Sequence, residues 1–370
     1  MSTFSRLLEQ IELKDFEIPI LQENDDYFPE FLESHLSNFI TLYEKKLVPY
    51  VDEKLIFTSG NKDVIISKIR SLSKTLIDVV NYFYAGEIHK ATETFNTGLD
   101  NVFFKDLAEL NVVTNIPIET NFYRARKSEN KRFDRKDLFH INFNLRHIVS
   151  TNRYSIPGFP ALYFGDNTYI CWEEFDRPDL KELNFSLFKN TRALKVIQLL
   201  RIEDLLSQLS ESNNQSIPFL LTYFTFFPLS IACSIKVKHV SGNFKPEYII
   251  PQLLLQYISE NKYLDGLKFP STKIDYSKLH KMSPYNYVFP VKCVKKEGFC
   301  DTLSDTFHCS QPTSLNLEEI IYNPTGTTHR MPETPDERKL ELIEEIKSPY
   351  TQTSFGKLEF RLKNREVKKI

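Results

Sequence analysis

The hydrophobic pattern of the chain changes near residue 121, and this change constrains the fold more than any other feature. Before it, apolar residues recur at three- and four-residue steps, as over 28–43 and 65–83. Such stripes place apolar side chains on one face of a helix. After it, short apolar runs alternate with turn residues, which is typical of strands. The sequence therefore predicts a helical first third followed by an α+β region.

The expected elements can be placed by residue. Helices are expected over 28–43, 65–83 (after a start signal at 59–63), 87–110, 167–175 and 246–262. Strands are expected over 121–126, 160–164, 193–200, 232–240 and 264–271, a polar surface loop over 207–216, and a loosely packed extension over 323–354. We therefore divide the chain into a helical domain (1–112), an α+β domain (113–310) and a C-terminal extension (311–370).

Composition excludes several classes of partner. The 47 basic and 49 acidic residues give a net charge of 47 − 49 = −2, so binding mainly to nucleic-acid phosphates or to anionic membrane is not expected. Five cysteines, an odd number in a long chain, fit a reducing cytosol better than a disulfide framework. The charged first residues lack the apolar middle of a secretory signal. These features favour a cytoplasmic protein.

One apolar stretch, residues 216–235, approaches the length of about 20 residues that spans a bilayer. Pro218 and Pro228 interrupt it, and Ser and Thr recur through it. We therefore expect a buried helix followed by a core strand rather than a membrane span.

Two arginines on the strand over 121–126 are candidates for binding an anion. Arg124 and Arg126 share a face of an extended strand because side chains alternate. Their planar guanidiniums suit a ligand with several anionic oxygens, such as a pyrophosphate. The alternative is a solvated strand face with ordinary salt bridges.

The segment 150–175 carries a second set of candidates. Arg153 lies before the Pro157-Gly158 turn, and Tyr163 follows on the next strand, where its ring could stack on a flat heterocycle. A helix then presents Glu173 and Glu174 about 100° apart, which predicts that only one of these acids faces the interior. A solvated helix with adjacent acids is the alternative.

Other candidate sites carry weaker signals. Ser271 ends the strand over 264–271, where its hydroxyl reaches a ligand or caps a turn. Cysteine and histidine gather over 293–309 without a Cys-x-x-Cys pair, so no metal site is expected. Ten glycines and the absence of a glycine-rich phosphate loop argue against a Rossmann site.

Taken together, "FYRAR", "RYSIPGFPALYFGDNTYICWEE" and "EYIIPQLLLQYISENKYLDGLKFPS" resemble the RES domain family in order and spacing, over about residues 121–272. That family is named for an arginine, a glutamate and a serine. The pattern of arginine and aromatic, Pro-Gly, tyrosine, and glutamate eleven positions later is met by Arg153, Tyr154, Pro157, Gly158, Tyr163 and Glu174. The family's first arginine falls on Arg124 and its serine on Ser271. The neighbouring Glu173 stays an alternative to Glu174.

The resemblance implies a fold similar to ADP-ribosyltransferases and a bacterial toxin or defence effector that degrades NAD, with NAD as substrate and no metal. It implies that Arg124 and Arg153 neutralise the pyrophosphate, that Tyr163 stacks on nicotinamide, and that Arg126 and Tyr154 are further contacts of NAD. Glu174 would stabilise the oxocarbenium-like ribose, with Arg124 and Ser271 closing the pocket as the other two catalytic residues.

Alternatives within this resemblance stay open. Hydrolysis and phosphorolysis of the nicotinamide–ribose bond are not distinguished, and transfer of ADP-ribose to a protein or a non-catalytic nucleotide-binding module are the alternatives. Family toxins usually pair with a small antitoxin, which makes an antitoxin or regulatory protein the expected partner. The helical first third, absent from compact forms of the family, is an alternative regulator in cis.

Overall fold

The computed structural model describes residues 3–24, 26–51, 62–103, 112–127, 133–211, 217–238, 242–322 and 336–370. The chain forms two compact units. The first contains Met1–Thr114, Asn152–Tyr154 and Ile197–Asn261; the second contains Asn115–Thr151, Ser155–Val196 and Lys262–Ile370. This division differs from the expected boundaries, because the described residues of 197–261 pack with the first helices and the described residues of 311–370 pack within the second unit.

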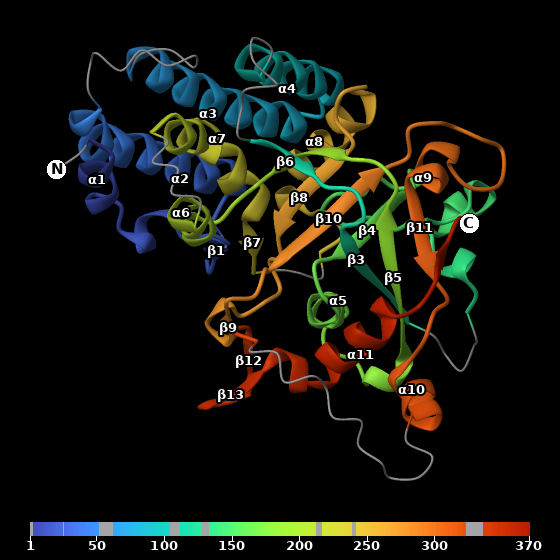
Figure 1. The fold of residues 1–370 in the computed structure, drawn as a ribbon. Helices are drawn as coiled ribbons and strands as arrows, with labels where there is room; N and C mark the ends of the chain where they lie inside the picture. Colours follow the sequence, from blue (N-terminus) through green and yellow to red (C-terminus); the bar gives the residue numbers. More distant parts are fainter. Residues whose placement is uncertain are drawn as a thin grey trace. The chain divides into compact units, whose positions relative to one another are not determined.

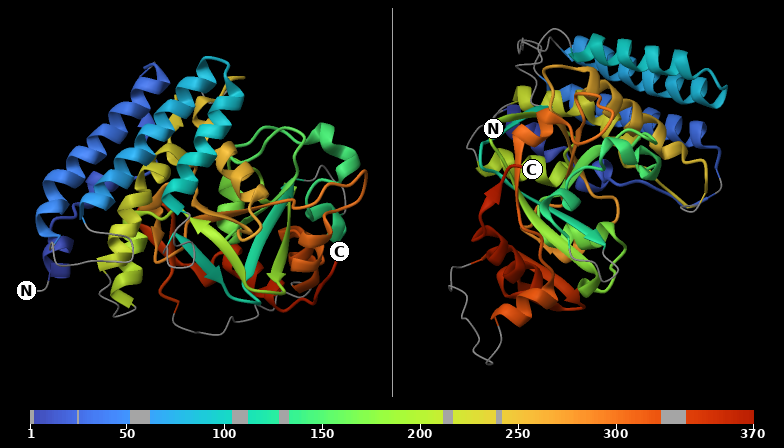
Figure 2. Two further views of the ribbon diagram at one scale, coloured as in Figure 1. Left: turned by 90° about the horizontal axis from the view of Figure 1, so that it is seen from above. Right: turned by 90° about the vertical axis from the view of Figure 1, so that its right-hand side faces the viewer.

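Helices of the first unit lie where the apolar stripes predict them. They are α2 (Phe28–Leu42), α3 (Lys62–Tyr84) and α4 (Ile88–Phe103), with the short α1 (Thr3–Glu9) before them. Figures 1 and 2 show α3 and α4 side by side. Ile65, Ile69, Leu72 and Leu76 of α3 are fully buried, as the stripe requires. Most of the start signal at 59–63 and the end of the helix expected over 87–110 lie outside the described residues.

The apolar stretch over 216–235 forms the buried helix α7 (Ile217–Ser234), which packs against α2 and α3. In the described part of the chain it is the one helix long and apolar enough to cross a membrane, and 83% of it is buried within the protein. The strand expected over 232–240 was wrong for its first residues, since α7 continues to Ser234 and β7 is only Lys236–Val237. An apolar run buried on every side has no periodicity that separates helix from strand.

Two further helices complete the first unit: α6 (Ile202–Glu211) and α8 (Ile249–Glu260). The expected surface loop over 207–216 is therefore helical up to residue 211, and its remainder lies outside the described residues. The helix expected over 246–262 is confirmed, with a short 3-10 turn before α8.

The second unit contains most of a nine-stranded mixed sheet with the order β14-β11-β5-β3-β4-β10-β8-β6-β2 (Figure 1). The α+β class predicted from the sequence is therefore confirmed. The strands are β2 (Val113–Ile116), β3 (Asn121–Lys127), β4 (Ala161–Gly165), β5 (Leu183–Asn190), β6 (Leu194–Gln198), β8 (Gly266–Pro270), β10 (Tyr285–Pro290), β11 (Phe307–Ser310) and β14 (Val367–Lys368).

The centre of this sheet is unevenly paired. β3 pairs antiparallel with β5 along its whole length, from Asn121↔Lys189 to Lys127↔Leu183. Its pairing with β4 on the other side is recorded at one position, Tyr123↔Gly165. β4 in turn pairs along its whole length with β10. Beyond that one position, backbone groups of β4 that face β3 therefore need other partners.

Opposite faces of the sheet bury different layers. On one face Phe122, Phe164 and Phe188 pack in an aromatic core, with Phe122 and Phe164 ring centroids 5.2 Å apart. On the other face, Tyr123 and Ala125 of β3 pack under α5 (Thr168–Glu174) and α11 (Ser354–Lys363) (Figure 1). Because side chains alternate along β3, this strand contributes residues to the hydrophobic layers on both faces of the sheet.

The C-terminal residues belong to this unit, which corrects the expectation of a loosely packed extension. β12 (Lys339–Ile343) pairs with β13 (Ile346–Pro349) and with β9 (Leu279–His280) in a three-stranded sheet. Tyr350 and Leu362 are fully buried. The Pro- and Thr-rich composition over 323–354 concealed this, and residues 323–335 lie outside the described part.

Helix α11 fixes the start of α5 through one buried carboxylate. Glu359 is 3% exposed, and its Oε1 accepts hydrogen bonds from Thr168 N (2.8 Å), Thr168 Oγ1 (3.3 Å) and the Tyr350 hydroxyl (2.5 Å). Burial raises the pKa of Glu359 above its ordinary value of 4.5. The position of α5 therefore depends on an acceptor supplied almost two hundred residues later.

Replacing Glu359 by alanine should lower the free energy of unfolding by about 2–4 kcal/mol, because a buried N–H and a buried hydroxyl lose their acceptor. Glu359→Gln keeps an oxygen acceptor and should cost little. Urea unfolding monitored by circular dichroism measures both. Glu366→Ala, which removes an exposed carboxylate paired with Lys368, is the matched control. Surface substitutions usually change the free energy of unfolding by less than about 0.5 kcal/mol. A loss of that size in Glu359→Ala would therefore contradict the anchoring role of Glu359.

The difference in stability between the wild-type protein and Glu359→Gln should depend on pH. Because the folded-state pKa of Glu359 is raised, its favourable contribution is fully present below the unfolded value of 4.5 and is lost as pH rises through the folded pKa. The stability of the wild-type protein relative to Glu359→Gln should therefore fall as pH increases from 4.5.

Candidate functional site

A strand, a tight turn and a short helix place the two adjacent acids. β4 ends at Gly165, where an added Cβ would lie 3.1 Å from Cys171 Sγ, so a glycine allows α5 to approach the strand closely. Asn167 caps α5 by accepting the Ile170 N–H at 2.9 Å. α5 then runs for seven residues and ends at Glu174.

Glu174 is half-buried and gathers groups from two other strands. Its Oε1 accepts hydrogen bonds from Ser271 Oγ (2.7 Å) and from Asn286 Nδ2 (2.6 Å). Ser271 follows β8 directly, and Asn286 lies on β10 opposite Gly165 of β4 and Phe269 of β8. Three segments distant in sequence therefore meet at one carboxylate oxygen.

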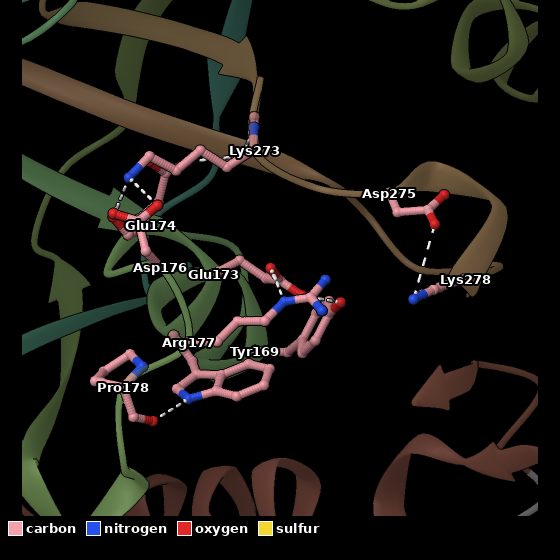
Figure 3. A network of polar contacts seen from close by, with 11 residues as sticks. Tyr169, Glu173, Glu174, Asp176, Arg177, Pro178, Lys273, Asp275 and Lys278 are labelled. Carbon is pink, nitrogen blue, oxygen red and sulfur yellow. Dashed lines mark hydrogen bonds and ion pairs between the residues drawn. The ribbon is translucent and has the colours of Figure 1, made fainter. Parts of the chain in front are cut away.

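Glu173 has different surroundings. It is 3% exposed, its Oε1 accepts a hydrogen bond from the Tyr169 hydroxyl, and its Oε2 accepts one from Arg177 Nε at 2.8 Å. Figure 3 shows Glu173 directed toward Tyr169 and Arg177, away from the contacts of Glu174. The more buried of the two acids is thus Glu173, and its carboxylate is fully engaged in holding α5 and the residues after it.

Ser271 caps a turn, which is one of the two roles considered for it, and its contact with a ligand stays a prediction. The residue is fully buried, and its hydroxyl donates to Glu174 while accepting the Lys273 N–H at 3.2 Å. Its own N–H donates to the Pro284 carbonyl at 3.0 Å. The hydroxyl therefore caps the turn after β8 and also orients the Glu174 carboxylate.

Arg124 lies on β3 next to Tyr123, the position at which β3 pairs with β4. Its Nη1 donates to the backbone carbonyl of Tyr163 at 2.9 Å, so the guanidinium satisfies a carbonyl that faces away from β10. Its buried Nε has no hydrogen-bond partner among the described residues. Burial lowers the pKa of Arg124 to about 10, so the side chain stays charged at neutral pH. A half-buried cation whose buried N–H has no partner among the described residues is able to bind an anion.

Two neighbours of Arg124 have contacts of their own. The Tyr163 hydroxyl forms a 2.7 Å hydrogen bond with Ser155 Oγ. The exposed Arg126 donates through Nη1 to the Asp137 carbonyl at 2.5 Å, and its guanidinium lies 4.9 Å from the centre of the Phe133 ring. The side chain of Arg126 is therefore directed toward the segment after β3.

Arg153 and Tyr154 belong to the first unit, not to the unit that contains Glu174. The Arg153 guanidinium donates to the backbone carbonyls of Ile235 (2.9 Å), Cys233 (3.2 Å) and Glu247 (3.4 Å). Tyr154 is almost fully buried. These contacts give Arg153 a structural function in joining the end of α7 to the start of α8.

Sequence reasoning missed Asn286 and Lys273. Asn286 stands in the otherwise apolar run "YNYVFP" and is buried, and a polar residue inside a buried strand was an available signal. Lys273 donates through Nζ to the Glu174 backbone carbonyl at 2.7 Å. Nothing in the local sequence of Lys273 distinguishes it from an ordinary surface lysine.

Among the described residues, no group of three or more His, Cys, Asp or Glu side chains could hold a metal ion. Cys293 and Cys300 lie with their sulfurs 3.1 Å apart, and His140 Nε2 already accepts the Cys300 N–H at 2.8 Å. A cavity of about 370 Å³ lies in the first unit, between α2, α7 and residues 14–20, and is lined by none of the candidate residues.

Glu173→Ala should destabilise the protein by about 2–4 kcal/mol, because it leaves a buried hydroxyl and a guanidinium without their acceptor. Thermal and urea unfolding measure the loss. Glu174→Gln keeps the oxygen that accepts both of its hydrogen bonds and should unfold within about 1 kcal/mol of the wild type. Equal destabilisation by the two substitutions would contradict the separate roles of the two acids.

Comparisons with known proteins place the chain in a bacterial family. No protein-family model matches the sequence, and no solved structure matches it. The resemblance to the RES family therefore stays a prediction. The chain is 32% identical over 368 residues to a protein of Bacillus subtilis (strain 168) described as "Putative toxin YopC", an alignment that covers 95% of this chain and 80% of the relative. The chain thus belongs to the same family as YopC.

Proposed function

We propose that this protein is a toxin that degrades NAD by cleaving the bond between nicotinamide and ribose. The observation that carries the proposal is the hydrogen bond between Ser271 and Glu174, 97 positions apart in sequence. These are the glutamate and serine of the RES pattern. The description of the relative as "Putative toxin YopC" supports the toxin part of this proposal.

The surroundings of Glu174 suit the chemistry of glycosidic bond cleavage. As nicotinamide leaves, positive charge develops on the ribose, and a carboxylate beside the sugar stabilises that charge. Both hydrogen-bond donors, Ser271 and Asn286, bind Oε1. Within the described part of the chain, Oε2 has no recorded donor and is left to contact the ribose. The two donors also fix the carboxylate in one orientation, which reduces the cost of reorganisation during the reaction.

Arg124 is the proposed contact for the pyrophosphate. Its side chain is half-buried, and its buried Nε–H is unpartnered among the described residues, so a phosphate oxygen would supply the missing acceptor. Tyr163, whose backbone Arg124 contacts, is the proposed stacking partner of nicotinamide. Arg126, Arg153 and Tyr154 stay proposed as further NAD contacts, although the three carbonyl partners of Arg153 favour a structural role for it.

A single assay separates the alternatives. Purified protein is incubated with NAD labelled in the adenosine, and free nicotinamide is measured. Release of nicotinamide with free ADP-ribose indicates hydrolysis, and a phosphorylated product formed only when phosphate is added indicates phosphorolysis. Label retained on protein indicates transfer of ADP-ribose. Binding of NAD without release of nicotinamide would indicate a non-catalytic module and overturn the proposal. An antitoxin is the proposed partner in the cell.

Glu174→Gln should reduce NAD cleavage by roughly 10²–10³-fold, because it removes one charge that stabilises the transition state while keeping the shape of the side chain. Release of nicotinamide under saturating NAD is the measurement. Asp179→Asn, an exposed acid just after the same helix, is the control and should keep wild-type activity. Full activity of Glu174→Gln would remove Glu174 from the reaction.

Arg124→Ala should weaken NAD binding by about 2–5 kcal/mol, the range for truncating one partner of a buried charge pair. Arg124→Lys should restore only part of the affinity, since lysine lacks the planar fork. Calorimetric titration of NAD in the Glu174→Gln background measures binding without turnover. Arg192→Ala is the control, because that guanidinium is exposed and paired with Asp265. Unchanged affinity of Arg124→Ala would contradict a contact with the pyrophosphate.

A further inference from the structure

The end of α5, which presents Glu174, has an unusual backbone. The Asp176 N–H donates to the Glu173 carbonyl (2.9 Å) and the Arg177 N–H to the Trp172 carbonyl (3.3 Å). This is the hydrogen-bond pattern of a Schellman motif, in which a left-handed residue ends the helix. Asp176 and Arg177 have φ angles of +59° and +56°. Glycine normally occupies the first of these positions, and here two consecutive residues with side chains adopt the left-handed conformation.

Ion pairs from the side chains of these two residues hold the turn. Arg177 pairs with Glu173 at 2.8 Å, and Asp176 pairs with Lys273 Nζ at 2.9 Å (Figure 3). A strained backbone persists only where its surroundings fix it. The left-handed turn after Glu174 is therefore set by contacts with Glu173 on one side and with Lys273 on the other.

Lys273 also reaches the helix itself. The Schellman bonds use the carbonyls of Trp172 and Glu173, and Lys273 Nζ donates to the next carbonyl, that of Glu174, at 2.7 Å. Lys273 is two residues after Ser271, whose hydroxyl holds Glu174 Oε1. Residues 271 and 273 therefore bind both the carboxylate and the backbone carbonyl of Glu174.

We propose that Lys273 and Asp176 form a positioning pair that sets the orientation of Glu174 for NAD cleavage. This inference rests on the function proposed above. Lys273 fixes the backbone carbonyl of Glu174 and the turn after it, so the carboxylate keeps its approach to the substrate while Ser271 and Asn286 hold Oε1.

The exposure of the pair separates positioning from stability. The side chains of Lys273 and Asp176 are 38% and 80% exposed, and such surface ion pairs contribute little to the free energy of unfolding. Displacement of a catalytic group by about 1 Å, in contrast, can lower a rate by up to about 10²-fold. Loss of the pair should therefore reduce turnover far more than it reduces stability.

The experiment compares Lys273→Met, Lys273→Arg and Asp176→Asn in the full chain. Lys273→Met should lower kcat by about 10-fold or more with little change in KM and in the melting temperature. Asp176→Asn removes the charge but keeps a residue that tolerates the left-handed conformation, and it should act in the same direction. Lys273→Arg should restore part of kcat. Lys278→Met is the matched control, because Lys278 has 34% exposure and pairs with Asp275 in the next turn.

Combination with Glu174→Gln gives a second readout. If Lys273 acts through Glu174, Lys273→Met should have almost no further effect on the residual rate of Glu174→Gln. An independent tenfold loss in the double variant would overturn positioning. So would wild-type kcat in Lys273→Met, or a fall in melting temperature that accounts for the lost activity. Each of these outcomes leaves NAD cleavage by the wild-type protein intact, whereas a wild-type protein that releases no nicotinamide overturns the proposed function and this inference together.

Discussion

The hydrogen bonds at Glu174 Oε1 depend on how the second unit buries both faces of its sheet. Because α5 packs over β3 and β4 is followed by α5 after a tight turn, Glu174 comes to lie at the ends of β8 and β10. Ser271 and Asn286 then reach the same oxygen. Helix α11, through Glu359, fixes the other end of α5. One carboxylate therefore has a defined direction because the layers around it are packed, and the proposed chemistry follows from that direction.

Two adjacent acids acquire opposite tasks from their environments. Glu173 accepts hydrogen bonds from Tyr169 and Arg177 and is almost completely buried. Glu174 accepts both of its hydrogen bonds at Oε1, and among the residues that the structure describes no side chain donates to its Oε2. Helical geometry alone separates the two side chains by about 100°. Burial did not identify the candidate catalytic acid, because the more buried residue is the one with satisfied partners. The two acids differ in their hydrogen-bond donors: those of Glu173 come from the same helix and the turn after it, and those of Glu174 come from distant segments.

The sequence predicted elements more reliably than their assembly. Helical stripes located α2 and α3, and alternation located β3, β4 and β8, because these patterns reflect local geometry. The packing of residues 197–261 with the first helices could not be predicted, since an apolar run such as α7 does not specify which layer covers it. The resemblance to the RES family singled out Glu174 and Ser271, but Asn286 and Lys273 became visible only when strands and turns were brought together. Arg153 matched the RES motif, but its contacts with the carbonyls of Cys233 and Ile235 could not be predicted, because they depend on where the end of α7 lies.

The interleaving of the two units has a consequence for synthesis on the ribosome. The apolar faces of α2 and α3 emerge early, but α7, which covers them, follows more than a hundred residues later. The N-terminal end of α5 likewise waits for Glu359. Both units are therefore completed late, so the nascent chain exposes apolar helix faces while it grows and offers a target for chaperones. This order of completion delays the assembly of the surroundings of Glu174 until translation has passed α11.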